Sequence, residues 1–159
     1  MPSFHDFRFL STDGKHNVFA RECTPDGEVR AVLQIAHGVA EHIYRYAPFM
    51  EFLAENGFVV VANDHLGHGK TAENEQELCF FAEKDGWNDV VSDMDQLHKP
   101  TAAKYPDVPY FLFGHSMGSF LTRTYIIDHP EGLKGVIISG TGQNPAAVVA
   151  PASSWQSSR

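Results

Sequence analysis

Short apolar runs alternate along the chain with stretches in which apolar residues recur every three or four positions. Runs of four to six mostly apolar residues, the pattern of strands covered on both faces, lie at 31–36, 58–62, 110–113 and 135–139. Helical spacing predicts helices at 46–56, at 86–98 and from 117 to about 129. This alternation predicts an α/β fold, a mostly parallel sheet with flanking helices and right-handed crossovers.

Both ends of the chain depart from this alternation. Residues 7–10 and 17–23 are typical of two strands around the Asp13-Gly14 turn, which predicts an N-terminal antiparallel hairpin. Residues 146–159 are rich in Ala and Ser and show no periodicity, so we expect a disordered tail there. Residues 1–145 are then expected to belong to a single domain.

Two residues set expected helix boundaries. Gly57 follows the helix predicted at 46–56 and suits the left-handed position that commonly ends a helix. Pro100 lacks a backbone N–H, so we expect it to end or kink the helix predicted at 86–98.

Composition narrows the range of partners. The formal net charge is -8 and the 12 Lys and Arg residues form no basic cluster, so a nucleic-acid partner is not expected. Cys23 and Cys79 show neither disulfide-framework nor metal-site spacing. The N-terminus lacks the features of a signal peptide and the apolar runs are too short to span a bilayer. We expect a cytoplasmic protein, for which peripheral membrane contact stays open.

The strongest chemical signal is Gly-His-Ser-Met-Gly at 114–118, between a predicted strand and a predicted helix. Gly-x-Ser-x-Gly in that setting predicts a nucleophile elbow, a sharp strand-to-helix turn with a strained serine at its apex. Gly114 and Gly118 are small where strand and helix nearly touch. Ser116 is the candidate nucleophile, and the N–H of Met117 is a candidate donor to an oxyanion.

A second loop supplies the partner of this elbow. His37-Gly-Val-Ala-Glu-His42 follows the first buried strand, where the N–H of Val39 is the candidate second oxyanion donor. Gly38 lets the backbone come close to a substrate carbonyl, and two donors are needed to hold one oxyanion. His115 supports the elbow, and we expect its side chain to point away from the approach to the Ser116 hydroxyl.

The stretch 63–71 has two alternative interpretations. Gly69-Lys70-Thr71 resembles the end of a P-loop, but Asp64 stands where that motif requires a glycine and would repel phosphate. Histidines in and near this stretch suggest a metal site, but their spacing matches no zinc signature. These residues are His37, His42, His65 and His68. We expect them to form hydrogen bonds in loops, and we expect neither a metal nor a cofactor.

Three stretches together carry a family resemblance. Residues 37–42, 64–69 and 114–118 resemble, in order, the signature motifs of the monoacylglycerol lipase/lysophospholipase family of serine-aminopeptidase-like α/β-hydrolases. The resemblance covers nearly all of residues 5–145. It implies an α/β-hydrolase core that hydrolyses carboxylic esters of monoacyl lipids through an acyl-enzyme on Ser116. It also implies a catalytic histidine, an acidic residue that orients it, and an architectural role for the Asp64 loop.

The histidine and the acid have no match in this sequence. In α/β-hydrolases they follow the serine, the acid first, on loops after later strands. After Ser116 the sequence holds one histidine, His129, beside the acids Asp128 and Glu131. His129 lies about 20 Å along the predicted helix at about 1.5 Å per residue, too far to act as the base. We therefore expect a core that is incomplete at the C-terminal side, as from a truncated or frame-shifted gene.

Two functional hypotheses follow from these residues. The first is a serine hydrolase of small lipid esters, with weak residual activity in this chain. The alternative is a catalytically impaired fragment that acts at most as a binding module. Incompleteness would also leave the strand at 135–139 as an apolar edge, which favours self-association.

Overall fold

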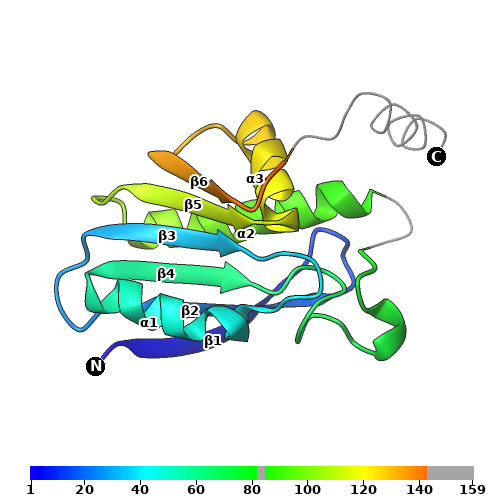
Figure 1. Cartoon of the computed structure of the whole chain (residues 1–159), viewed down its shortest axis with the longest axis horizontal. Coiled ribbons are helices and arrows are strands. Elements are labelled where there is room, and N and C mark those ends of the chain that lie inside the picture. The colour runs from blue at the N-terminus through cyan, green and yellow to red at the C-terminus, as the bar shows by residue number, and fades with distance from the viewer. Residues whose placement is uncertain (82–84, 143–159) are drawn as a thin grey trace.

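The computed structural model describes residues 1–81 and 85–142, and within these ranges six strands form one sheet. The strand order is β1-β2-β4-β3-β5-β6 (Figure 1). The strands are β1 (Ser3–Leu10), β2 (Asn17–Thr24), β3 (Ala31–Ala36), β4 (Phe58–Asn63), β5 (Tyr110–His115) and β6 (Gly135–Ser139). The helices are η1 (Ile43–Tyr46), α1 (Ala47–Glu55), η2 (Glu75–Glu77), α2 (Gly86–Lys104) and α3 (Met117–Asp128).

The pairing confirms the mostly parallel sheet and the antiparallel hairpin expected from the sequence. β3 pairs parallel with both β4 and β5, and β5 pairs parallel with β6. β2 pairs antiparallel with β1 and with β4, so the hairpin extends the parallel part of the sheet. The predicted tail and the domain boundary at residue 145 lie outside the described residues.

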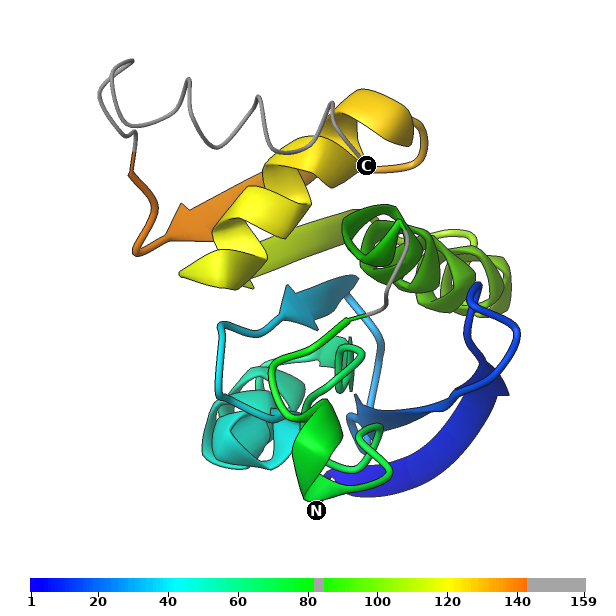
Figure 2. The ribbon, with the colours of Figure 1, turned by 90° about the vertical axis from the view of Figure 1, so that its right-hand side faces the viewer.

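Helices cover both faces of the sheet. Leu33 and Ile35 of β3 pack in one cluster with Met50 and Ala54 of α1. The alternate residues of β3 face α2 and α3, so Ala36 packs in a cluster with residues of those two helices. Figure 2 shows α1 on one side of the sheet and α2 with α3 on the other. Burial on both faces explains why β3 reads as an almost continuous apolar run.

The polar residue in that run is accommodated by hydrogen bonds. Gln34 is buried, its amide N–H donates to the carbonyl of Met94 (3.0 Å), and its amide oxygen accepts from the Tyr110 hydroxyl (2.5 Å). Both polar ends of the side chain are therefore paired, as burial requires.

The predicted end of the second helix near Pro100 is wrong. α2 continues to Lys104 with Pro100 inside it. Thr101 is buried and its hydroxyl donates to the carbonyl of Leu97 (2.7 Å), while Ala102 packs against the core. Burial of the turn after Pro100 outweighs the lost backbone hydrogen bond, an effect that the local sequence does not reveal.

The last strand is less covered than its apolar sequence suggests. β6 pairs with β5 along one side, and Ile137 is 50% exposed. The expectation of a strand buried on both faces is therefore wrong for the described residues, whereas the expectation of an apolar edge is confirmed.

None of the helices in residues 1–81 and 85–142 combines the length and the apolar character that crossing a membrane requires.

Parallel pairing places the predicted site residues at one edge of the sheet. The carboxyl ends of β3, β4 and β5 point the same way (Figure 1). The loop at 37–42, the loop at 64–71 and the serine at 116 follow these three ends. This edge is where open α/β sheets bind their ligands.

Candidate active site

Ser116 occupies a strained backbone position between β5 and α3. Its φ is +55° and its ψ is -118°, a conformation that costs a residue other than glycine about 1–3 kcal/mol. The backbone N–H of Ser116 donates to the carbonyl of Ser139 in β6 (2.9 Å). The backbone N–H and the hydroxyl of Ser119 donate to the carbonyl of Ser116 (2.9 and 2.6 Å). Neighbouring elements therefore hold the strained turn.

Ser119 lies in the first turn of α3, three residues after the strained serine. Ser119 is fully buried, and its hydroxyl donates a hydrogen bond that holds the Ser116 carbonyl in place. The sequence alone did not indicate this contact.

Gly114 and Gly118 allow the strand and the helix to meet. A Cβ on Gly118 would lie 1.9 Å from the carbonyl oxygen of Ala36 in β3, and one on Gly114 would lie 2.3 Å from the carbonyl oxygen of Gly118. Neither glycine has a positive φ, so the requirement is for space and not for a special conformation. The close approach expected of an elbow is present at both positions.

The loop after β3 lies directly against the elbow. A Cβ on Gly38 would be 3.1 Å from the Cβ of Ser116 and 3.3 Å from the carbonyl oxygen of His115. Val39, the next residue, is 53% exposed, and its N–H has no hydrogen-bond acceptor among the described residues. Met117 is the first residue of α3, where a backbone N–H has no partner within the helix. The structure thus brings together the loop and the turn that carry the two candidate donors.

Glu41 is a residue of this site to which the sequence analysis assigned no role. Its carboxylate accepts from the N–H of Gly38 (2.7 Å) and from the hydroxyl of Tyr46 (2.9 Å). Burial raises the pKa of Glu41, but these two hydrogen bonds, together with the nearby His115 and Arg45, outweigh burial, so the pKa lies below its ordinary value. The spacing Gly38-x-x-Glu41 could have indicated the contact, because in a capping box the acid three residues on reaches back to a backbone N–H.

His115 faces the last strand. Its Nδ1 lies 3.2 Å from the hydroxyl oxygen of Ser139, and a Cβ on Gly140 would be 3.0 Å from its Cε1. The ring therefore packs between β5 and the end of β6.

Three histidines from the loops after β3 and β4 form a buried cluster. The rings of His37 and His65 lie 4.1 Å apart between centroids, and that of His68 lies 5.2 Å from His37. Each ring nitrogen that bonds a carbonyl acts as a donor: His37 Nδ1 to Gly38, His65 Nε2 to His37 and His68 Nδ1 to Leu66. Burial lowers the pKa of His37 to about 4 and holds the pKa of His65 well below its ordinary range. The expectation of hydrogen-bonding histidines is confirmed for His37, His65 and His68, which are buried, unlike ordinary loop side chains. It is wrong for His42, which is exposed and whose ring has no hydrogen-bond partner among the described residues.

Asp64 organises the loop after β4. Its two carboxylate oxygens accept from the N–H of Ile43 (2.8 Å) and the N–H of Lys70 (2.9 Å). The ammonium of Lys70 donates to the hydroxyl of Tyr44 (3.0 Å). Asp64 therefore joins its own loop to the start of η1, which fits the architectural role that the resemblance implied.

A shallow depression of about 360 Å³ lies next to the elbow. Its lining combines aromatic side chains with charged and polar groups: Glu41, Arg45, Tyr46, Phe49, Phe113 and His115. A larger depression of about 580 Å³ is lined by residues between 25 and 30 and between 54 and 57, with Met1 and Pro2. None of the predicted site residues lines the larger one, so the smaller one is the candidate for substrate.

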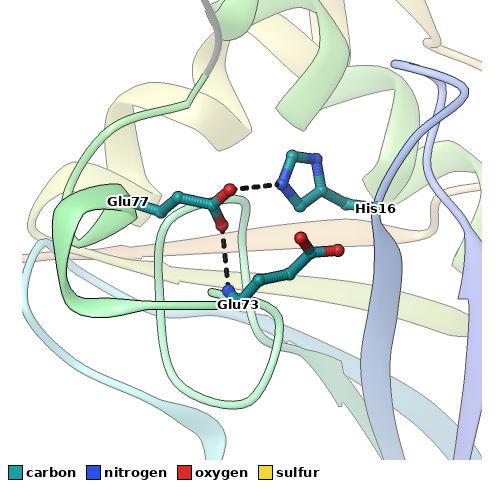
Figure 3. A group of neighbouring side chains, drawn as sticks. All are labelled: His16, Glu73 and Glu77. Atoms are coloured by element: carbon teal, nitrogen blue, oxygen red, sulfur yellow. Dashed lines mark hydrogen bonds and ion pairs between the residues drawn. The ribbon is translucent and has the colours of Figure 1, made fainter.

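His16, Glu73 and Glu77 form a group with metal-ligand chemistry, and their ligand atoms lie within 4.8 Å of one another (Figure 3). Both ring nitrogens of His16 already have partners, Asp13 for Nδ1 (2.5 Å) and Glu77 for Nε2 (3.1 Å). Burial lowers the pKa of His16, but these two hydrogen bonds raise it more, so the imidazole is charged more readily than usual. His16, Asp13 and Glu77 therefore form an ion-pair cluster that joins the β1–β2 turn to the segment around η2, and the backbone N–H of Glu73 donates to the Glu77 carboxylate.

His129 is engaged far from the serine. It follows α3 and lies 3.6 Å from a carboxylate oxygen of Asp95, with its ring packed on Tyr125. The length of α3 separates it from Ser116. This placement agrees with the estimate that His129 cannot act as the base.

Comparison with known proteins relates this chain to a family of serine hydrolases. The sequence profile of the family described as serine aminopeptidase, S33 matches residues 27–158. The monoglyceride lipase of Mus musculus is 31% identical over 129 residues, which are 81% of this chain and 40% of that protein. The monoacylglycerol lipase of Mycolicibacterium smegmatis is 32% identical over 128 residues, 80% of this chain and 44% of that protein.

A solved structure shows the shared architecture. A highly thermostable carboxyl esterase from Bacillus coagulans, solved in complex with glycerol, is 41% identical with a TM-score of 0.85 over 94% of this chain and 49% of that protein. The present chain therefore spans less than half of the length of each of these three proteins. Its sheet, elbow and loops form part of an α/β-hydrolase core, and the chain belongs to the serine aminopeptidase S33 family.

Proposed function

We propose that this chain carries the nucleophile and the oxyanion-binding half of a hydrolase that cleaves carboxylic esters of monoacyl lipids. The observation that carries the proposal is the backbone conformation and placement of Ser116. It is held at φ +55° at the start of a helix, directly against Gly38. A strained serine beside two backbone N–H groups is the arrangement that acyl transfer requires.

The proposed reaction proceeds through an acyl-enzyme. The hydroxyl oxygen of Ser116 attacks the ester carbonyl, and its proton passes to a general base. The carbonyl oxygen becomes an oxyanion that accepts hydrogen bonds from the N–H groups of Val39 and Met117. The ester C–O bond then breaks, the alcohol leaves with a proton, and water hydrolyses the acyl-serine to release the fatty acid and the free hydroxyl.

The lipid substrate is proposed from two supports. Relatives at 31% and 32% identity are a monoglyceride lipase and a monoacylglycerol lipase. The depression beside the elbow offers Phe49 and Phe113 for apolar contact and Arg45 for polar contact. A lipid with one acyl chain and a polar head group matches such a mixed lining.

The second candidate function is a catalytically impaired binding module. It is favoured by the placement of His129, the sole histidine after Ser116 in the sequence, which packs against Tyr125 and Asp95. A serine without its base and acid keeps only the part of catalysis that comes from binding and the oxyanion hole. In that case the chain binds lipid esters but turns them over slowly.

A fluorophosphonate probe separates the two candidates. The folded chain is incubated with the probe, digested and mapped by mass spectrometry, with Ser116→Ala as the matched control. Covalent labelling at Ser116 that is lost in the control supports an activated nucleophile. A folded chain that stays unlabelled at Ser116 contradicts the hydrolase proposal and favours the binding module.

Two exposed apolar surfaces are proposed to contact a second copy of the chain and a lipid surface. Ile137 and Ile138 on β6 are exposed and apolar, which favours self-association through this edge. Phe49, which lines the depression, and Phe52 are exposed on α1 and are candidates for peripheral contact with a lipid surface. The cytoplasmic location expected from the sequence stays a prediction.

A further inference from the structure

The loop that carries Val39 is strained and must be held in place. Ala40 has a φ of +56°, a left-handed conformation that residues other than glycine seldom adopt. Such a conformation persists only where surrounding groups determine it. Val39 and Ala40 are exposed, so the restraint has to come from their neighbours in the chain and not from burial of their own side chains.

Both polar groups of Gly38 are held by side chains. Its N–H donates to the Glu41 carboxylate (2.7 Å), and its carbonyl accepts from Nδ1 of His37 (2.7 Å). The backbone N–H of Glu41 adds a longer bond to the same carbonyl (3.4 Å). Tyr46 in turn holds the Glu41 carboxylate through its hydroxyl (2.9 Å).

The tautomer of His37 is set from both sides of the ring. A carbonyl can only accept, so Nδ1 carries the proton that bonds Gly38. On the other side, Nε2 accepts from the backbone N–H of His65 (3.1 Å), so it carries none. The ring is fully buried, which favours this neutral form. His37 is therefore a fixed donor to the Gly38 carbonyl.

These contacts determine the direction of the next N–H. In a trans peptide the carbonyl of Gly38 and the N–H of Val39 point in opposite directions. Because the carbonyl is bound by a buried ring, the Val39 N–H points away from that ring, and Gly38 itself abuts Ser116. A flipped peptide would present a carbonyl oxygen there and repel an oxyanion.

We propose that Glu41 and His37 are positioning residues of this loop. Glu41 holds the His37–Gly38 peptide through the Gly38 N–H, and His37 holds the Gly38–Val39 peptide through the Gly38 carbonyl, so that the Val39 N–H is available to the oxyanion on Ser116. This inference rests on the proposed function for its catalytic consequence, but the geometry of the loop can be tested without it. Glu41 acts through Gly38 and is not expected to contact the reacting atoms.

The test compares three variants of the chain. Glu41→Leu removes the acceptor of the Gly38 N–H, Glu41→Gln keeps a carbonyl oxygen without the charge, and Glu55→Leu removes an exposed carboxylate at the end of α1 as a control. The first readout is the pair of backbone amide resonances of Gly38 and Val39 in ¹H–¹⁵N spectra. The second is the rate of fluorophosphonate labelling at Ser116.

The expected results follow from the hydrogen bonds. In Glu41→Leu the resonance of the Gly38 amide proton moves upfield, and the Val39 amide resonance shifts or broadens. The maximal rate of labelling at Ser116 falls by about 10- to 100-fold, because one oxyanion donor is misplaced. In Glu41→Gln the Gly38 amide moves less and most of the rate returns. Glu55→Leu leaves both readouts unchanged.

Two outcomes count against the proposal, and they are distinct from failure of the proposed function. Gly38 and Val39 resonances that stay at their wild-type positions in folded Glu41→Leu overturn it, as does an unchanged rate in that variant. If Glu41→Leu does not fold, Glu41→Gln decides, because an unmoved Gly38 amide in that isosteric variant also overturns it. If the wild-type chain is never labelled, the hydrolase proposal fails, and the two amide resonances decide the positioning role alone.

Discussion

Replacing Gly118 with alanine tests the packing on which the elbow depends. The new methyl group would lie 1.9 Å from the carbonyl oxygen of Ala36 and 2.7 Å from that of His37, both backbone atoms. Helix α3 and strand β3 would have to separate by about 1 Å to reach even a tight contact. A side chain could rotate away from such a clash, whereas a paired strand cannot.

The Gly118→Ala substitution should lower the free energy of unfolding. Overpacking typically costs about 1–3 kcal/mol when side chains can adjust, so a backbone clash should cost about 3 kcal/mol or more. Alanine gains back about 0.4–1 kcal/mol by restricting the unfolded chain. The net loss is therefore about 2 kcal/mol or more, and the melting temperature should fall by about 4–8 °C for a domain of this size.

The assay is thermal unfolding followed by circular dichroism, with Gly27→Ala as the matched control. Gly27 has no positive φ, and a Cβ there meets nothing within 4 Å, so its melting temperature should stay within about 2 °C of wild type. Ser116 labelling should also be lost in Gly118→Ala. A Gly118→Ala chain that melts with the wild type would refute the claim that strand and helix touch at this glycine.

Three further predictions concern charge, the base and the edge strand. Because His37 has a pKa of about 4 when folded and about 6.5 when unfolded, the unfolded state binds an extra proton between these values. The free energy of unfolding should fall by about 3 kcal/mol as the pH drops through that window, and a urea midpoint that is constant from pH 7 to 4.5 would contradict this. His129→Ala should label at Ser116 at the wild-type rate, and a large loss of labelling in folded protein would make this histidine a candidate base after all. Ile137→Lys should shift sedimentation profiles from associated species toward monomer, whereas a wild-type chain that is monomeric throughout argues against association through β6.

Much of the fold could be predicted because local signals and tertiary packing agree. The run at 31–36 is apolar since β3 is buried on both faces, and its bounds in the structure are the predicted ones. The helix around Pro100 could not be predicted in the same way. Its continuation depends on Thr101 and Ala102 meeting the core, which is a contact distant in sequence. The exposure of β6 likewise depends on its neighbours, not on its composition.

Some residues of the candidate site could likewise be predicted from local sequence, whereas others depend on tertiary contacts. Gly114, Ser116 and Gly118 could be located because an elbow needs these residue types at fixed spacing between a strand and a helix. The contacts of Glu41 and Ser119 could not, because each depends on where a neighbouring backbone group points. The burial of the histidine cluster was also missed, since three loop residues meet there only when β3 and β4 lie side by side.

The most direct test of the oxyanion site is a crystal structure of the chain with Ser116 phosphonylated. We expect Ser116 to keep its positive φ and the phosphoryl oxygen to lie about 3 Å from the backbone nitrogens of both Val39 and Met117. A phosphoryl oxygen beyond hydrogen-bond distance of both nitrogens, or a serine in an ordinary helical turn, would contradict the claim that this site stabilises an oxyanion.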